Sequence, residues 1–108
     1  MTFNEYQLGA REFAVYPAVG ENLIYPVLGL VGEAGELANK VKKIQRDGGA
    51  LTDEIRSALI SELGDVLWYV AAVCGELGVR MGDVAESNLS KLSGRLERGT
   101  LRGSGDRR

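Results

Sequence analysis

The sequence contains no histidine, a single cysteine (Cys74) and only two prolines among its 108 residues. Without imidazole there can be no Ser-His-Asp triad, no Cys-His nucleophile pair and no histidine-ligated zinc. One cysteine cannot form an internal disulfide or a thiolate zinc site, which fits a reducing cytoplasm. Any metal must therefore be held mainly by oxygen ligands, and such ligands favour Mg²⁺ or Mn²⁺.

Basic residues are scarce over most of the chain. Residues 1–94 hold 8 basic and 13 acidic side chains, whereas residues 95–108 hold five arginines and two acids. The acidic body argues against a nucleic-acid partner, because binding nucleic acid needs a basic face that displaces counterions. No stretch approaches the roughly 20 apolar residues of a membrane span, and the N-terminus lacks a signal-peptide pattern. We therefore expect a cytoplasmic protein with no membrane partner.

Helical spacing of apolar residues, interrupted by glycine, predicts four helices and no strands. The helices are expected over about 2–15, 22–46, 52–77 and 81–98. Thr2 and Glu5 form a possible capping box for the first helix, and Thr52 is a suitable cap for the third. We expect residues 1–98 to form one all-α domain, a four-helix bundle, and residues 99–108 to form an irregular tail rich in glycine and arginine.

The third predicted helix is apolar around much of its circumference, from Ile55 to Leu77. Such a helix belongs in the middle of a bundle or at a subunit interface. Because a chain of this length has a small core of its own, the excess apolar surface on the second and third predicted helices favours an oligomer. The alternative is a monomer whose central helix is unusually apolar.

Two of the predicted helices each carry a pair of acids three residues apart. Glu33 and Glu36 lie on the second helix, and Glu62 and Asp65 lie on the third. Residues at i and i+3 project from the same side of a helix, and buried carboxylates need a partner. Two antiparallel helices presenting such pairs would form an oxygen cage for Mg²⁺. For the first pair taken alone, the alternative is an ordinary solvated helix face.

Polar residues on the fourth predicted helix form a single stripe. Asn88, Lys91 and Arg95 follow one another at helical spacing, opposite the leucines of that helix. A stripe of this composition that faced a metal cage could bind phosphate oxygens. On an isolated helix the same stripe is more typical of a solvated face.

Further candidate substrate contacts lie near the acids. Lys40 and Lys43 follow Glu36 at i+4 and i+7 and share its face, although Lys40 could simply form an ion pair within the helix. Trp68, the only tryptophan, follows the second acid pair, with Tyr69 beside it. Either aromatic ring could stack on a nucleobase, and we expect Trp68 to do so; plain core packing is the better-supported role for at least one of the two.

The paired acids resemble the motif of a known family. Glu33-x-x-Glu36, a gap of 25 residues and Glu62-x-x-Asp65 together resemble the MazG-like all-α nucleoside triphosphate pyrophosphohydrolases. The similarity extends over nearly the whole chain, from FNEYQ through GLVGEAGELANKVKK, ELGDVLWYVA and NLSKLSGR to RGTLRGSGDRR. The motif is fairly specific to this superfamily and does not specify one nucleotide.

The resemblance implies a four-helix fold that assembles as dimers or tetramers. It also implies Mg²⁺-dependent hydrolysis of a nucleoside triphosphate to the monophosphate and pyrophosphate, with Mn²⁺ as a possible substitute. The residues carried over as catalytic metal ligands are Glu33, Glu36, Glu62 and Asp65. Those carried over as phosphate contacts are Asn88, Lys91 and Arg95.

The chain departs from some relatives at one position. They have an extra glutamate directly before the first motif acid, where this chain has Gly32. We therefore expect Glu33 to act as the base, with water attacking at the α-phosphorus. The stretch Gly103–Arg107 also resembles one found in small members of the family, and we expect it to fold over a phosphate of its own or of a neighbouring subunit.

Three functions stay open at this point. The leading one is a nucleotide-pool housekeeping enzyme that acts on several nucleoside triphosphates. The second is a relative of narrow specificity, such as a dCTP, dUTP or phosphoribosyl-ATP pyrophosphohydrolase. The third is a helical interaction module that binds Mg²⁺-nucleotide without turnover, although the presence of all four acids favours catalysis.

Overall fold

The computed structural model describes residues 1–108, which form four α-helices and no strands. The helices are α1 (Phe3–Arg11), α2 (Ile24–Arg46), α3 (Asp53–Leu77) and α4 (Met81–Glu97). The prediction of an all-helical chain with four helices is therefore confirmed. Two boundaries differ from it: α1 ends at Arg11 rather than near Val15, and α2 begins at Ile24 rather than at Asn22.

The helix ends follow from local sequence signals. Thr2 and Glu5 form the predicted capping box, in which each side chain accepts the other residue's backbone N–H at 3.0 Å. The hydroxyl of Thr52 accepts the backbone N–H of Ile55 at 3.2 Å and so caps α3. Gly78 ends α3 with a φ of 70°, a left-handed conformation that glycine adopts without steric cost.

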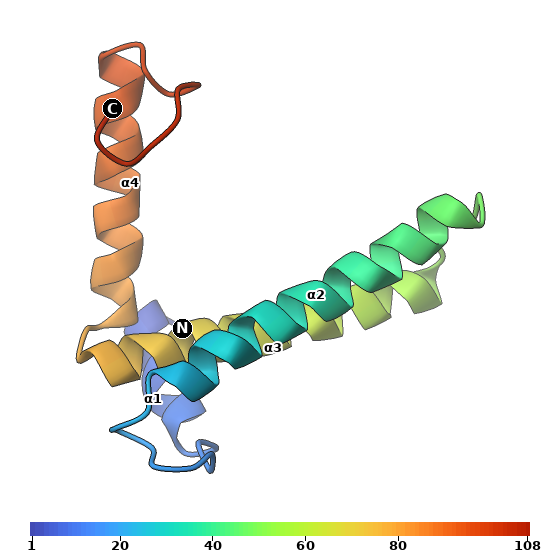
Figure 1. Ribbon diagram of the computed structural model, residues 1–108, viewed down its shortest axis with the longest axis horizontal. Helices are drawn as coiled ribbons and strands as arrows, with labels where there is room; N and C mark the ends of the chain where they lie inside the picture. Colours follow the sequence, from blue (N-terminus) through green and yellow to red (C-terminus); the bar gives the residue numbers. More distant parts are fainter.

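The helices α2 and α3 form a long antiparallel hairpin, and α1 crosses the end of α3 that lies farthest from the hairpin turn (Figure 1). In contrast, α4 projects away from the other three helices (Figure 1) and does not contact α2. Its start is fixed by α1: the backbone N–H of Met81 donates to Gln7 Oε1 at 2.8 Å, and that of Gly82 donates to Asn4 Oδ1 at 2.8 Å. A single chain thus has the expected helices without closing into a compact bundle.

The core of the single chain is small. Only 7 of its 108 residues are buried, and they include Ala71, Cys74 and Met81, where α3 meets α1 and α4. Large apolar side chains stay exposed on the hairpin and on α4, for example Leu63 and Leu89 at 53% and 68%. A protein that leaves this much apolar surface in water is poorly stabilised as an isolated chain.

By length and composition, α3 could cross a membrane, contrary to the expectation from the sequence. The central helix of a soluble protein passes the same test, and α3 is the helix that contacts all three others. It also carries Glu62 and Asp65 midway along its length. These charged groups and contacts fit a central helix.

The loop between α1 and α2 is held by Glu76, a contact that the sequence did not predict. The Glu76 carboxylate accepts hydrogen bonds from the Tyr16 hydroxyl, from the Gly20 N–H at 2.8 Å and from the Asn22 N–H at 3.2 Å. The bond from Tyr16 is the main cause that lowers the pKa of Glu76, while burial and this bond raise the pKa of Tyr16 to about 12. Glu76 therefore fixes the chain entering α2, and with it the position of the acids on that helix.

Candidate metal and nucleotide site

Three of the four motif acids meet across the hairpin. Glu33 comes from α2, and Glu62 and Asp65 come from α3; one carboxylate oxygen of each lies within 4.8 Å of the others. The Glu62 side chain is 17% exposed, and its Oε2 is buried without a hydrogen-bond partner. The antiparallel register of α2 and α3 brings the two sequence motifs together at this point.

The cluster is electrostatically unfavourable without a cation. Partial desolvation raises the pKa of Glu33, as do a hydrogen bond with Glu62 and the negative charges of Asp65, Glu62 and Glu36. Carboxylates this close cannot all ionise at low cost unless a positive charge lies between them. The all-oxygen donor set and the unpartnered Glu62 oxygen fit Mg²⁺ or Mn²⁺.

Glu36 lies outside the group of three. It is exposed on α2, one turn beyond Glu33, and it acts on the cluster through its charge. The structure therefore brings three of the four predicted metal ligands together and leaves Glu36 at the edge of the site.

Lysines adjoin the cluster on the side toward the hairpin turn. The ammonium of Lys40 lies 3.8 Å from Glu62 Oε1, across the hairpin rather than within its own helix. Lys43 lines a hollow of about 370 Å³ between the end of α2 and the start of α3, and Lys40 lines it too. Sequence reasoning selected Lys43 as a substrate contact; Lys40 is the lysine that reaches the acids.

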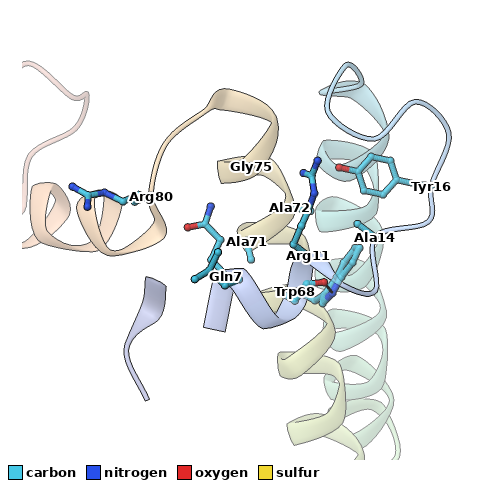
Figure 2. A pocket seen from close by; sticks show the side chains of 11 residues that line it. Gln7, Arg11, Ala14, Tyr16, Trp68, Ala71, Ala72, Gly75 and Arg80 are labelled. Carbon is cyan, nitrogen blue, oxygen red and sulfur yellow. Dashed lines mark hydrogen bonds between the residues drawn. The ribbon is translucent and has the colours of Figure 1, made fainter. Parts of the chain in front are cut away.

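Trp68 is directed toward α1. Its indole N–H donates to the Ala10 carbonyl at 3.1 Å, which ties α3 to α1. Figure 2 shows it beside a second hollow of about 370 Å³, together with Arg11 and Tyr16. In the single chain, Trp68 thus serves mainly in packing, the alternative that the sequence left open.

Tyr69 is the aromatic residue that faces the acids. Its ring packs so closely on Gly29 of α2 that a Cβ there would lie 2.2 Å from Tyr69 Cε1. Burial is the main cause that raises the pKa of Tyr69, and the charges of Glu33 and Asp65 add to it. Tyr6 of α1 also lies near enough for Asp65 to raise its pKa, after the larger effect of burial. No sequence signal pointed to Tyr6.

The polar stripe of α4 is not brought to the acids of its own chain. Asn88 is exposed, and Lys91 and Arg95 bind the tail instead. Lys91 Nζ donates to Asp106 Oδ1 at 3.2 Å, and Arg95 Nη2 donates to the same oxygen at 3.1 Å. Arg95 is only 5% exposed, and its Nε is buried without a partner.

The tail contains no helix or strand, and hydrogen bonds fold it back on α4. The Arg108 side chain donates to the carbonyls of Thr100 at 2.8 Å and Leu101 at 3.1 Å, and Arg98 donates to the Arg108 carbonyl at 2.8 Å. Hydrogen bonds from Arg95 and then Lys91 lower the pKa of Asp106. Asp106 therefore stays ionised and occupies the two cations predicted to contact phosphate.

The chain is similar in sequence to known proteins. The model of the MazG nucleotide pyrophosphohydrolase domain matches residues 25–99, which include both acid pairs and all of α4. The chain is 51% identical over 109 residues to "Gene 37 protein" of Mycobacterium phage L5, an alignment that covers 95% of this chain and 96% of that protein. No solved structure matches. The chain belongs to the MazG nucleotide pyrophosphohydrolase family.

Proposed function

We propose that this protein is a Mg²⁺-dependent nucleoside triphosphate pyrophosphohydrolase. It would convert ribo- or deoxyribonucleoside triphosphates to monophosphates and pyrophosphate, as a housekeeping enzyme of the cytoplasmic nucleotide pool. The observation that carries the proposal is the convergence of Glu33, Glu62 and Asp65, with one Glu62 oxygen buried and unpartnered, in a chain of this family.

The three acids have distinct roles in this proposal. A bound Mg²⁺ would neutralise phosphate charge and lower the pKa of a water molecule. Glu62 and Asp65 hold the metal, with Glu36 adding negative charge at the rim. Glu33 meets these two acids from the opposite helix, and it would accept a proton from the water that attacks the α-phosphorus opposite the leaving pyrophosphate.

A second copy of the chain completes the site in this proposal. Asn88, Lys91 and Arg95 carry the predicted phosphate contacts, yet α4 leads them away from α2. The exposed apolar faces of the hairpin and of α4 provide surface for a homodimer or homotetramer. In such an assembly the α4 cations of one subunit would serve the acids of another.

The test is a substrate panel. Each nucleoside triphosphate and deoxynucleoside triphosphate, together with phosphoribosyl-ATP, is incubated with the protein and Mg²⁺, and pyrophosphate is measured. Release from several substrates supports the housekeeping function, and release from one alone supports a narrow-specificity relative. Nucleotide binding with no release from any substrate would instead identify a non-catalytic nucleotide-binding module. Release that survives Glu62→Ala and Asp65→Ala together would exclude the assigned site.

A further inference from the structure

Residues of different chemistry follow one another along the hairpin of α2 and α3. Along α2 the order is Gly29, Glu33, Lys40 and Lys43, each about one to two turns after the one before. The aromatic group lies at the Gly29 end: Tyr69 packs on Gly29, and the rings of Trp68 and Tyr69 meet edge to face at 5.0 Å. The acid cluster thus separates an aromatic end of the hairpin from a lysine end.

The lysine end contains the hollow of about 370 Å³ near the hairpin turn, large enough for a small polyanion. Its wall comes from the last turns of α2 and the first turns of α3. Lys40 belongs both to this wall and to the acid cluster, because its ammonium is 3.8 Å from Glu62. Lys40 therefore connects the hollow with the acid cluster, although none of the three acids lines the hollow. The lining residues are Lys40, Lys43, Ile44, Asp47, Gly49, Ile55 and Ala58.

The charge in the hollow is available to a ligand. Asp47 is its one carboxylate, and both of its oxygens are taken by Arg46 at 2.8 and 3.0 Å. The hydrogen bond from Arg46 is also the main cause that lowers the pKa of Asp47. Lys43 forms no ion pair, and Lys40 has only the long contact with Glu62. Two ammonium groups can thus turn toward an anion beside the acids.

We infer that this hollow, through Lys40 and Lys43, binds the leaving pyrophosphate. The inference rests on the proposed function and adds a direction to it: the β- and γ-phosphates lie toward the hairpin turn and the nucleoside lies toward Tyr69. The α-phosphorus then lies at Glu33, Glu62 and Asp65, between the two ends.

The chemical step balances with water as the only co-reactant. The water oxygen bonds to the α-phosphorus, and the bond from that phosphorus to its bridging oxygen breaks. The electron pair of the broken bond leaves with pyrophosphate, the monophosphate retains the new oxygen with one proton of the water, and the other proton goes to Glu33. The ammonium of Lys40 stabilises the charge that develops on the bridging oxygen, and Lys43 holds the far phosphate.

The experiment measures binding of inorganic pyrophosphate by isothermal titration calorimetry in the presence of Mg²⁺. Lys43→Gln is the diagnostic variant, because Lys43 is exposed and touches no acid of the cluster, so the metal site stays intact. We expect the dissociation constant for pyrophosphate to rise about 10-fold, since one charge-assisted contact is lost. The dissociation constant of a nucleoside monophosphate should stay unchanged. Lys40→Gln should weaken pyrophosphate binding as well.

Lys42→Gln is the matched control, because Lys42 lies on α2 about 180° around the helix from Glu33 and is exposed. Pyrophosphate binding that is unchanged in Lys43→Gln, equally weakened in Lys42→Gln, or absent from the wild-type protein would overturn the inference. Pyrophosphate release in the substrate panel is independent of these titrations. A protein that binds pyrophosphate through Lys43 but hydrolyses no triphosphate would refute the proposed function and leave the subsite standing.

Discussion

The hairpin of α2 and α3 and the arm, which consists of α4 and the tail to residue 108, contain opposite arrangements of charged groups. The hairpin gathers three acids, of which Glu62 alone contacts a cation, the ammonium of Lys40 at 3.8 Å, and desolvation and the neighbouring charges raise the pKa of Glu33. The arm gathers cations and pairs two of them with its own Asp106, whose pKa is lowered. Negative charge therefore exceeds positive charge in the hairpin cluster, whereas the arm supplies an anion for its own cations.

This contrast indicates which region has an internal partner for its charges. In the arm, Arg95 is buried under the tail and binds Asp106, and only its Nε has no hydrogen-bond partner. In the hairpin, Glu62 Oε2 is buried without a partner, and the other Glu62 oxygen has only the long contact with Lys40. A divalent cation and a polyphosphate would satisfy the hairpin, whereas Asp106 already holds Lys91 and Arg95 in fixed positions.

The largest expected effect is on the hairpin. Glu62→Gln retains the shape of the side chain and removes one charge from the cluster, so metal binding weakens and the rate of pyrophosphate release falls by about 100-fold or more. Circular dichroism shows whether the variant is folded. An unchanged rate in a folded variant would mean that the acids do not form the reaction centre.

Mixing two inactive variants tests whether the two regions act across subunits. Glu62→Gln is co-expressed with the double variant Lys91→Ala, Arg95→Ala. In mixed dimers one of the two sites has its full set of residues, so activity should recover to about a quarter of the wild-type rate on statistical grounds. No recovery, with mixed dimers verified by native mass spectrometry, would contradict a site shared between subunits.

A smaller effect is expected at the tail. Asp106→Asn removes the charge that pairs with Lys91 and Arg95, so the tail loosens and these cations lose their fixed positions. We expect KM for the triphosphate to rise about 5-fold, with less change in kcat. Deleting residues 99–108 should have at least this effect. Unchanged kcat and KM in both proteins would remove the tail from the account.

The two regions should also respond oppositely to pH when no metal is present. The folded state binds the Glu33 proton more tightly than the unfolded state, so the free energy of unfolding falls as pH rises above the ordinary pKa of 4.5. Asp106 stabilises the fold above its ordinary pKa, and this contribution is lost as pH falls through the lowered pKa.

Thermal melts in EDTA at a series of pH values measure both changes in stability, the loss above pH 4.5 due to Glu33 and the loss at lower pH due to Asp106. Glu62→Gln should reduce the loss due to Glu33, and Asp106→Asn should reduce the loss due to Asp106. Added Mg²⁺ should also reduce the loss due to Glu33, and a loss that Mg²⁺ leaves unchanged would argue against a metal at the cluster.

The smallest expected effect is on stability, and it tests whether Trp68, unlike Tyr69, serves in packing rather than at the substrate. Trp68→Phe removes the hydrogen bond to Ala10 and should lower the free energy of unfolding by about 1 kcal/mol, measured by urea denaturation, with the activity per folded molecule retained. A variant of normal stability with a raised KM would instead place Trp68 at the substrate.

Short-range features of the fold were predictable from the sequence. Thr2 and Thr52 cap the helices they were expected to cap, and Gly78 ends α3, because capping depends on residues a few positions apart. The meeting of Glu33 with Glu62 was also predictable. The two acid pairs lie about equally far along the chain from the turn between α2 and α3, so an antiparallel hairpin places them opposite each other.

Long-range features were not predictable in this way. The outward course of α4, the Glu76 contact with Tyr16 and the pairing of Asp106 with Arg95 all depend on how distant segments pack. The same limit explains the choice of Trp68 over Tyr69. Helical spacing places the two residues side by side, and only packing against α1 and α2 shows which one faces the acids.

The most direct test of the central claim is isotope placement. The wild-type protein hydrolyses a nucleoside triphosphate in H₂¹⁸O with Mg²⁺, and mass spectrometry locates the label in the products. Attack at the α-phosphorus predicts ¹⁸O in the nucleoside monophosphate and none in pyrophosphate. Label in pyrophosphate would contradict attack at the α-phosphorus, and labelled orthophosphate would contradict the pyrophosphohydrolase reaction itself.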